Sequence, residues 1–302
     1  MKILVLGASG FLGMYLGFAL QSAGHRAIGV TRTTVSPFAE SRVIRSTDDV
    51  EREIRSDSWD AVINCIAMAS HEACEQNPRE AENVNVKLPG IWARAARDVG
   101  AQFLHVSTDA VFDGQSDSLY REEDAPQPRS TYGRTKLNGE YEVQNHNSDA
   151  LITRVNFFGW SRDRKAGILD FFVSALEEGR LVTGFQDYVV SSLYVADLVD
   201  AWLGLLSLRS KGLFHVVAST PQSKFEFAVQ VAQELGLSED FIQPGFMTDV
   251  PNMVSRGHNL GLSTARVELS LGRPMPTTRE GIARAILERD AVHKYFSRAP
   301  AV

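Results

Sequence analysis

A glycine-rich turn between a short apolar strand and a helix constrains the fold of this chain more than any other segment. Lys2–Leu6 predicts a buried strand, which runs directly into the stretch Gly7-Ala8-Ser9-Gly10-Phe11-Leu12-Gly13. Glycines there permit a tight turn and close backbone approach, while the first N–H groups of the helix are free to bind phosphate. This context predicts a dinucleotide site, and a glycine-rich turn without a ligand is the alternative. The residues expected to contact the dinucleotide are Gly7, Ser9, Gly10, Phe11, Leu12 and Gly13.

Strand and helix patterns alternate through the first half of the chain. Strands are expected at 2–6, 26–30, 61–64, 102–106 and 150–154, and helices at 11–23, 48–55, 79–98 and from near Tyr132. The right-handed crossover rule makes this alternation an α/β fold with a doubly wound parallel sheet of the Rossmann type. The second half is less regular, with helices expected at 168–178, 195–208, 223–236 and 279–289 and a strand at 213–217.

This change of pattern predicts a second, smaller, discontinuous α/β domain that binds substrate. We expect residues 1–157 and 187–218 to form the dinucleotide-binding Rossmann domain, and residues 158–186 and 219–302 to form the substrate domain.

The end of the second strand indicates which dinucleotide binds. An acidic residue that bonds the ribose 2′-hydroxyl is expected about 20 residues after the glycines. The chain has Val30-Thr31-Arg32-Thr33-Thr34 instead, with no acid until Glu40. A guanidinium suits a 2′-phosphate through paired hydrogen bonds, and the threonine hydroxyls could add more. Arg32 therefore favours NADP(H) over NAD(H), and a solvated surface arginine is the alternative.

Tyr132 and Lys136 lie four residues apart in a predicted helix, so their side chains share one face. A free phenol has a pKa of about 10, which is too high for ready proton exchange near neutrality. A fixed cation nearby would favour the phenolate and lower that pKa, which would suit the tyrosine to act as a general acid. The spacing alone also fits an ordinary surface helix with a polar face.

Composition excludes several other classes of protein. The net charge is -6 and the chain has no dense basic run, which argues against nucleic-acid binding. No segment approaches the 18 or so apolar residues of a membrane span, and the two cysteines are too few for a disulfide scaffold, so a cytoplasmic protein is expected. Cys65, His71 and Cys74 match no paired-ligand spacing, so no metal site is expected.

Several motifs, in this order, resemble the extended short-chain dehydrogenases/reductases, and most closely the dTDP-4-dehydrorhamnose reductase group. They are the glycine turn, Asn64-Cys65-Ile66-Ala67, Val84-Asn85-Val86, Ser107-Thr108-Asp109-Ala110-Val111-Phe112-Asp113-Gly114, the segment from Tyr132 to Glu140, Arg154-Val155-Asn156-Phe157-Phe158-Gly159, and residues 192–198 and 259–264. The resemblance covers nearly the whole chain.

The resemblance implies a role for each matching residue. Thr108 would hydrogen-bond the substrate carbonyl and the tyrosine, Tyr132 would deliver the proton, and Lys136 would bind the nicotinamide ribose and lower the tyrosine pKa. The other implied contacts are Ala67 and Asn85 for the cofactor, and Met68, His71, Asp109, Ala110, Phe157 and Arg256, together with Thr108, for the substrate. Asn85 could instead pack between helices, Phe157 could be core, and His71 and Arg256 could be surface residues.

One departure bears on the activity. Ala110 stands where the closest group usually has tyrosine and where related 4,6-dehydratases have an acidic glutamate. Alanine cannot exchange a proton, so dehydration is not expected. The resemblance implies an NADPH-dependent reductase of the 4-keto group of a nucleotide-activated deoxysugar, with a homodimer as the family expectation. The alternatives are a nucleotide-sugar epimerase with bound NAD and a non-catalytic regulatory subunit resembling the beta subunit of methionine adenosyltransferase.

Overall fold

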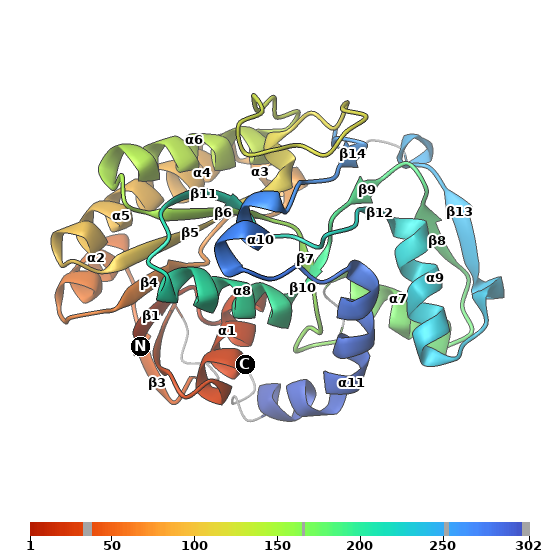
Figure 1. The fold of residues 1–302 in the computed structure, drawn as a ribbon, viewed down its shortest axis with the longest axis horizontal. Helices are drawn as coiled ribbons and strands as arrows, with labels where there is room; N and C mark the ends of the chain where they lie inside the picture. The colour runs from red at the N-terminus through yellow and green to blue at the C-terminus, as the bar shows by residue number, and fades with distance from the viewer. Residues whose placement is uncertain (33–37, 165–166, 251–253, 298–302) are drawn as a thin grey trace.

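The computed structural model describes residues 1–32, 38–164, 167–250 and 254–297. Its centre is a seven-stranded sheet with the order β11-β6-β5-β4-β1-β2-β3 (Figure 1). Every neighbouring pair in this sheet is parallel. The strands are β1 (Lys2–Leu6), β2 (Arg26–Thr31), β3 (Glu40–Val43), β4 (Ala61–Asn64), β5 (Gln102–Thr108), β6 (Leu151–Val155) and β11 (Gly212–His215). The predicted doubly wound α/β fold is confirmed, and the strand order reverses between β1 and β4.

Helices cover both faces of this sheet, because successive side chains of a strand point to opposite faces. Ile3 and Val5 belong to a core cluster that includes α1 (Phe11–Ser22) and α8 (Val195–Ser207). Leu4 and Leu6 belong to a second cluster, with α2 (Thr47–Arg55) and α5 (Leu88–Asp98). The apolar run of β1 is therefore buried on both sides, as a central parallel strand requires.

The single helix expected at 79–98 is three consecutive pieces. α4 (Pro78–Glu82) continues into a π-helical turn (Asn83–Lys87) and then into α5. The wide turn lies against α6 (Thr131–His146), where a Cβ on Gly139 would stand 2.1 Å from the Asn85 carbonyl oxygen. Glycine at 139 lets the two helices approach this closely. Because the contact involves a distant helix, the residues of the π turn alone do not predict it.

The remaining elements form smaller sheets and helices beside the main sheet (Figure 1). Three small sheets have the orders β10-β7, β12-β9-β14 and β13-β8. Their strands are β7 (Phe157–Phe158), β8 (Val182–Phe185), β9 (Val189–Val190), β10 (Leu193–Tyr194), β12 (Gln222–Ser223), β13 (Ile242–Gly245) and β14 (Asn259–Leu260). The helices are α3 (His71–Gln76), α7 (Ile168–Glu177), α9 (Lys224–Leu235), α10 (Ala265–Leu271) and α11 (Thr278–Phe296), with 3₁₀ turns at Asp109–Val111, Glu239–Phe241 and Met247–Asp249.

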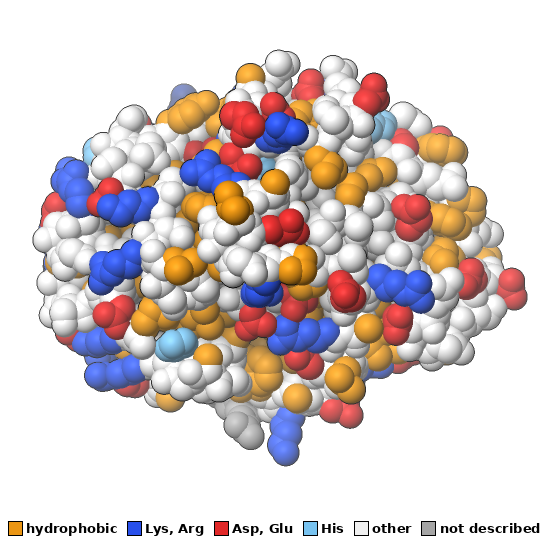
Figure 2. All heavy atoms as spheres, viewed as in Figure 1, with side chains coloured by type: hydrophobic (Ala, Val, Ile, Leu, Met, Phe, Trp, Pro, Cys, Tyr) orange, Lys and Arg blue, Asp and Glu red, His pale blue; other side chains and the backbone are white. Residues whose placement is uncertain are grey.

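The first core cluster runs without a break from β1 and α1 to α7, α9 and α11. The two predicted domains therefore share a core, and their boundaries stay a prediction. Figure 2 shows one face of the molecule, on which acidic and basic side chains are intermixed. None of the helices in the described ranges is long and apolar enough to cross a membrane.

Candidate active site

The carboxyl ends of the parallel strands meet at one edge of the sheet, and most of the predicted site residues follow them. Gly7 comes directly after β1, Arg32 after β2 and Cys65 after β4, while Thr108 is the last residue of β5. In doubly wound folds, ligands bind in the crevice outside this edge where the strand order reverses. The topology therefore brings together segments that are far apart in the sequence.

Thr108 and Tyr132 meet because the start of α6 packs closely on the segment after β5. The Ser130 side chain caps α6 by accepting a hydrogen bond from the Gly133 N–H at 3.2 Å. A Cβ on Gly133 would stand 2.2 Å from the Ala110 carbonyl oxygen, so glycine permits the contact. The phenol of Tyr132 is hydrogen-bonded to the Thr108 side chain. Thr108 itself accepts from the Ala110 N–H at 3.2 Å and donates to Asp109 Oδ1 at 3.0 Å.

Lys136 lies one turn further along α6 and is only 2% exposed. Its ammonium donates to the Val106 carbonyl oxygen at 2.6 Å, which anchors α6 to β5. Burial lowers the pKa of Lys136 to about 8, opposed by the negative charge of Glu140. The side chain is therefore a buried cation held at the carboxyl end of the sheet.

The expected lowering of the Tyr132 pKa is wrong for this structure. Burial raises the pKa of Tyr132 to about 12, and the charge of Asp109 adds to the increase, while the hydrogen bond with Thr108 opposes it. The Lys136 ammonium is engaged with a backbone carbonyl instead. The phenol is therefore held in its protonated form, which is the form a proton donor must have.

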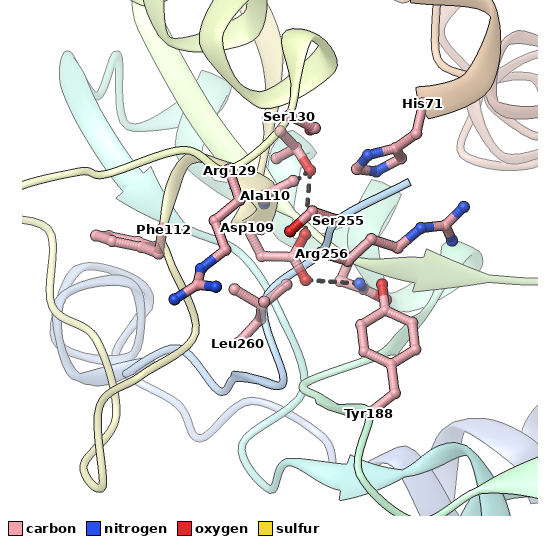
Figure 3. A pocket seen from close by; sticks show the side chains of 13 residues that line it. His71, Asp109, Ala110, Phe112, Arg129, Ser130, Tyr188, Ser255, Arg256 and Leu260 are labelled. Carbon is pink, nitrogen blue, oxygen red and sulfur yellow. Dashed lines mark hydrogen bonds between the residues drawn. The ribbon is translucent and has the colours of Figure 1, made fainter. Parts of the chain in front are cut away.

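A cavity of about 140 Å³ opens beside these residues. Five of the seven residues predicted to contact substrate line it: His71, Thr108, Asp109, Ala110 and Arg256. Figure 3 shows the side chains of His71, Asp109, Ala110 and Arg256 around the hollow, with those of Arg129 and Tyr188. Sequence reasoning assigned no role to Arg129, Asn156 and Tyr188. Arg129 and Tyr188 lie outside the recognised motifs, whereas Asn156 lies within the motif at 154–159. Ala110 contributes a small side chain to the wall, so this cavity has no acid at that position.

His71 packs against the catalytic candidate. Its ring lies 4.8 Å from the Tyr132 ring, centroid to centroid. Burial lowers the pKa of His71 to about 4, and the positive charge of Arg256 acts in the same direction. His71 is therefore neutral near pH 7 and holds the phenol ring without adding charge to the site.

Two arginines place positive charge on the cavity wall. Arg256 donates to Glu72 Oε1 at 2.6 Å, which joins its loop to α3. The Nε of Arg256 is buried without a hydrogen-bond partner, although it is a strong donor. Arg129 lines the same cavity from the loop before α6. The cavity therefore suits a ligand that carries negative charge.

Asn85 and Met68 are placed differently from the prediction. The Asn85 side chain is fully buried, and its amide accepts from the Met68 N–H at 2.9 Å. The same amide donates to the Met68 carbonyl and to Thr135 Oγ1, each at 3.1 Å. Asn85 therefore connects the loop after β4 to α6, which favours the packing alternative, and its contact with the cofactor stays a prediction. The backbone N–H and carbonyl of Met68 are hydrogen-bonded to Asn85, and Met68 is not among the residues that line the cavity.

Phe157 also lies away from the cavity lining. Its ring is stacked on that of Phe11, with 5.9 Å between centroids and 24° between planes. Phe157 therefore lies beside the glycine turn, and the structure favours a packing role over substrate contact. Ala67 is exposed in the loop after β4 and remains free to contact a ligand.

The glycine turn has the shape that a dinucleotide requires. Gly7 has φ = 83°, a conformation that favours glycine, and a Cβ on Gly13 would stand 2.3 Å from the Gly7 carbonyl oxygen. Ser9 and Gly10 are exposed at the start of α1. The backbone therefore leaves open the N-terminus of a 12-residue helix, whose first N–H groups point outward.

Arg32 is exposed just beyond β2. The predicted contribution of Thr33 and Thr34 falls outside the described residues.

In the described ranges, no group of three or more His, Cys, Asp or Glu side chains is arranged to hold a metal ion, and Cys65 and Cys74 are both free thiols.

A doubly wound sheet with an open glycine turn after β1, and with Thr108, Tyr132 and Lys136 at its carboxyl edge, defines an NAD(P)-dependent oxidoreductase of the extended short-chain dehydrogenase/reductase class. The chain belongs to the RmlD substrate binding domain family, whose sequence profile matches residues 1–290. The resemblance inferred from the motifs is thereby confirmed.

Known proteins similar to this chain include reductases and a subunit of methionine adenosyltransferase. The probable low-salt glycan biosynthesis reductase of Haloferax volcanii is 32% identical over 94% of this chain and 96% of its own length. Methionine adenosyltransferase 2 subunit beta of Pongo abelii is 28% identical over 91% of this chain and 84% of its own length. The crystal structure of a dTDP-4-dehydrorhamnose reductase from Clostridium acetobutylicum has a TM-score of 0.85 at 25% identity, covering 96% of this chain and 100% of that one.

Proposed function

We propose that this protein is an NADPH-dependent reductase of the 4-keto group of a nucleotide-activated deoxysugar. The observation that carries the proposal is the hydrogen-bonded pair of Thr108 and Tyr132 at the edge of a cavity beside a buried lysine. Reduction of a ketone builds negative charge on oxygen, which needs a placed proton donor. The neutral Tyr132 phenol supplies that proton, and Thr108 lies beside the phenol.

The residues present fit a dinucleotide cofactor. A Cβ at Gly13 would clash with the Gly7 carbonyl oxygen, so glycine there lets the start of α1 pack closely on the turn, as the pyrophosphate-binding turn of such folds requires. Lys136 would bind the nicotinamide ribose, and Arg32 would bind the 2′-phosphate of NADPH. The reduced nicotinamide, when bound, supplies a hydride to the ketone carbon.

The substrate would enter the cavity beside Ala110. The cations of Arg129 and Arg256 on the cavity wall suit the diphosphate of a nucleotide sugar.

We also propose a homodimer in the cytoplasm. The two free cysteines, Cys65 and Cys74, fit a reducing compartment.

The proposed activity is tested by following NADPH oxidation with a panel of nucleotide 4-keto-6-deoxysugars that differ in base and sugar. We expect turnover with at least one member of the panel and none with the corresponding 4-hydroxy sugars. NAD⁺ that stays bound through purification, with epimerisation and no net NADPH oxidation, would indicate the epimerase alternative.

A regulatory role is a second candidate, because the chain is similar to a methionine adenosyltransferase beta subunit over most of its length. Under this alternative, a synthetase partner would co-purify with the chain, and no 4-ketosugar would be reduced. The neutral phenol of Tyr132 beside an open cavity favours catalysis over this alternative.

Replacing Arg32 tests the cofactor preference. We expect Arg32→Ser to weaken NADPH binding by roughly ten- to a hundredfold, because hydrogen bonds to a charged group contribute roughly 1.5–3 kcal/mol. NADH binding should stay close to that of the wild type, since NADH has no 2′-phosphate. Fluorescence titration with both cofactors measures the ratio. An equal loss for both would contradict the assignment of Arg32 to the 2′-phosphate.

A further inference from the structure

A chain of buried and partly buried hydrogen bonds runs from the proposed catalytic centre to a lysine on another part of the fold. Thr108 Oγ1 donates to Asp109 Oδ1 at 3.0 Å, and Asn156 Nδ2 donates to Asp109 Oδ2 at 2.6 Å. Ser192 Oγ donates to Asn156 Oδ1 at 2.6 Å. The Lys224 ammonium donates to Ser192 Oγ at 3.3 Å. The path is unbroken, and it ends on a cation that plays no part in the mechanism proposed above.

The position of Lys224 is unfavourable unless a negative charge lies nearby. Lys224 is the first residue of α9, where the helix dipole disfavours a cation. Its ammonium lies 5.5 Å from the centre of the Tyr188 ring and 5.9 Å from that of Phe227. Burial lowers the pKa of Lys224 to about 8, and the charge of Asp109 opposes that decrease. Asp109 therefore stabilises the charge of Lys224.

The charge of Lys224 in turn stabilises the ionised carboxyl of Asp109. Asp109 is only 4% exposed. Burial raises the pKa of its carboxyl, while hydrogen bonds from Asn156 and Thr108 and the charge of Lys224 oppose the increase. Figure 3 shows the Asp109 side chain among those of the cavity wall, with Tyr188 nearby. The buried Asp109 carboxyl and the partly buried Lys224 ammonium are thus opposite charges joined through Asn156 and Ser192.

This pair determines which way the Thr108 hydroxyl points. A hydroxyl has one hydrogen and two acceptor positions. While Asp109 is a carboxylate, it takes the hydrogen of Thr108, and the Ala110 N–H takes one acceptor position. The second acceptor position of the hydroxyl is then left open. A protonated Asp109 carries a hydrogen of its own, so the direction of the Thr108 hydroxyl would no longer be fixed.

We propose that Lys224 is a positioning residue for the reduction: through Ser192, Asn156 and the Asp109 carboxylate it fixes the orientation of the Thr108 hydroxyl beside Tyr132. The inference rests on the proposed reductase function. Lys224 is not among the residues that line the cavity, and it acts through Asp109. It also neutralises the Asp109 charge that would otherwise oppose phenolate formation at Tyr132.

The titration of Asp109 can be measured separately from that of its neighbours, because most of the surrounding groups keep their charge state in the same pH range. The titratable and charged groups that face it or share its cavity are Lys224, Tyr132, Tyr188, His71, Arg129 and Arg256. Arginine stays charged throughout, His71 is neutral above its pKa of about 4, and Tyr132 ionises only near its pKa of about 12. Burial raises the pKa of Tyr188 as well, so its phenol stays neutral. Between the pKa of His71 and the pKa of Tyr132, the groups named above that can change charge are therefore Asp109 and Lys224.

The test compares Lys224→Met with Lys224→Arg and with Lys211→Met. Lys211 is an exposed lysine paired with Asp149, and it serves as the matched control. Removing the Lys224 charge should raise the pKa of Asp109 by about one unit or more, because an opposite charge nearby favours the ionised carboxyl. Carboxyl ¹³C NMR of aspartate-labelled protein, with Asp109→Asn to assign the signal, measures this shift without substrate.

Kinetics supply the second readout. The positioned state is lost as pH falls through the Asp109 pKa, so the acid limb of kcat should move to higher pH in Lys224→Met. We expect kcat near neutrality to fall about tenfold, less than the loss of an oxyanion donor outright. The KM for NADPH should stay unchanged. Lys224→Arg should restore most of kcat, and Lys211→Met should match the wild type.

An unchanged Asp109 titration in folded Lys224→Met would overturn the proposal, as would equal kcat values for Lys224→Met and Lys211→Met. If Lys224→Met fails to fold, Lys224→Gln replaces it in the same comparison. If the wild type reduces no ketosugar, the reductase function fails, while the NMR titration still decides whether Lys224 controls Asp109.

Discussion

Tyr132→Phe is expected to lower kcat for ketosugar reduction by about 10²- to 10⁴-fold, the usual contribution of general acid catalysis. The phenyl ring can keep its contact with His71, 4.8 Å away between ring centres. Only the hydroxyl that is hydrogen-bonded to Thr108 is lost. NADPH affinity should therefore change little, because the glycine turn and Lys136 remain in place.

The control for this variant lies on the same helix. Tyr141 is 53% exposed on α6, so Tyr141→Phe should leave both turnover and NADPH binding as in the wild type. Steady-state NADPH oxidation and a fluorescence titration of NADPH measure the two properties for each variant. Substantial activity in Tyr132→Phe would mean that another group donates the proton, and the proposed mechanism would be wrong.

Local signals were enough to predict much of this fold. The strand, glycine turn and helix from Lys2 onward are found as expected, because a turn with positive φ at Gly7 and close packing at Gly13 requires glycine whatever lies around it. The position of the Tyr132 helix also follows from its own residues, since Ser130 caps it and i, i+4 spacing defines its face. These features depend on residues within one or two turns of each other.

Features that depend on distant residues could not be predicted. The π-helical turn at Asn83–Lys87 is matched to Gly139 and Thr135 on another helix. Strands of two to four residues, such as β8 and β13, pair across long separations and carry too few residues to show a period. Arg129, Tyr188 and Lys224 reach the site or its support from three separate segments, each of which has the sequence pattern of an ordinary loop or helix.

The direction of the Tyr132 pKa shows the same limit. The spacing to Lys136 correctly indicated a shared helix face, but the pKa depends on how deeply the phenol is buried and on the nearby Asp109 charge. Neither can be read from the spacing. A helix face defines which groups can meet, whereas the surrounding core decides which protonation state each group holds.

The buried ion pair of Glu140 and Arg154 is the second feature whose loss should have a large effect. Arg154 donates two hydrogen bonds to Glu140, at 2.9 and 2.8 Å, and the two side chains are only 4% and 6% exposed. Ser107 donates to the same carboxylate. Because Ser107 precedes Thr108 on β5 and Glu140 follows Lys136 on α6, this cluster holds the strand of the site against its helix.

Glu140→Gln is therefore expected to lower the free energy of unfolding by about 3–5 kcal/mol, because removing one partner of a buried pair leaves the other charge uncompensated. Asp149→Asn is the control, since the Lys211–Asp149 pair is exposed and such pairs contribute at most about 1 kcal/mol. Urea unfolding followed by circular dichroism compares the two variants with the wild type. Equal stability of the two variants would show that the buried cluster does not hold β5 and α6 together, and the precise placement of Thr108 beside Tyr132 would then need another explanation.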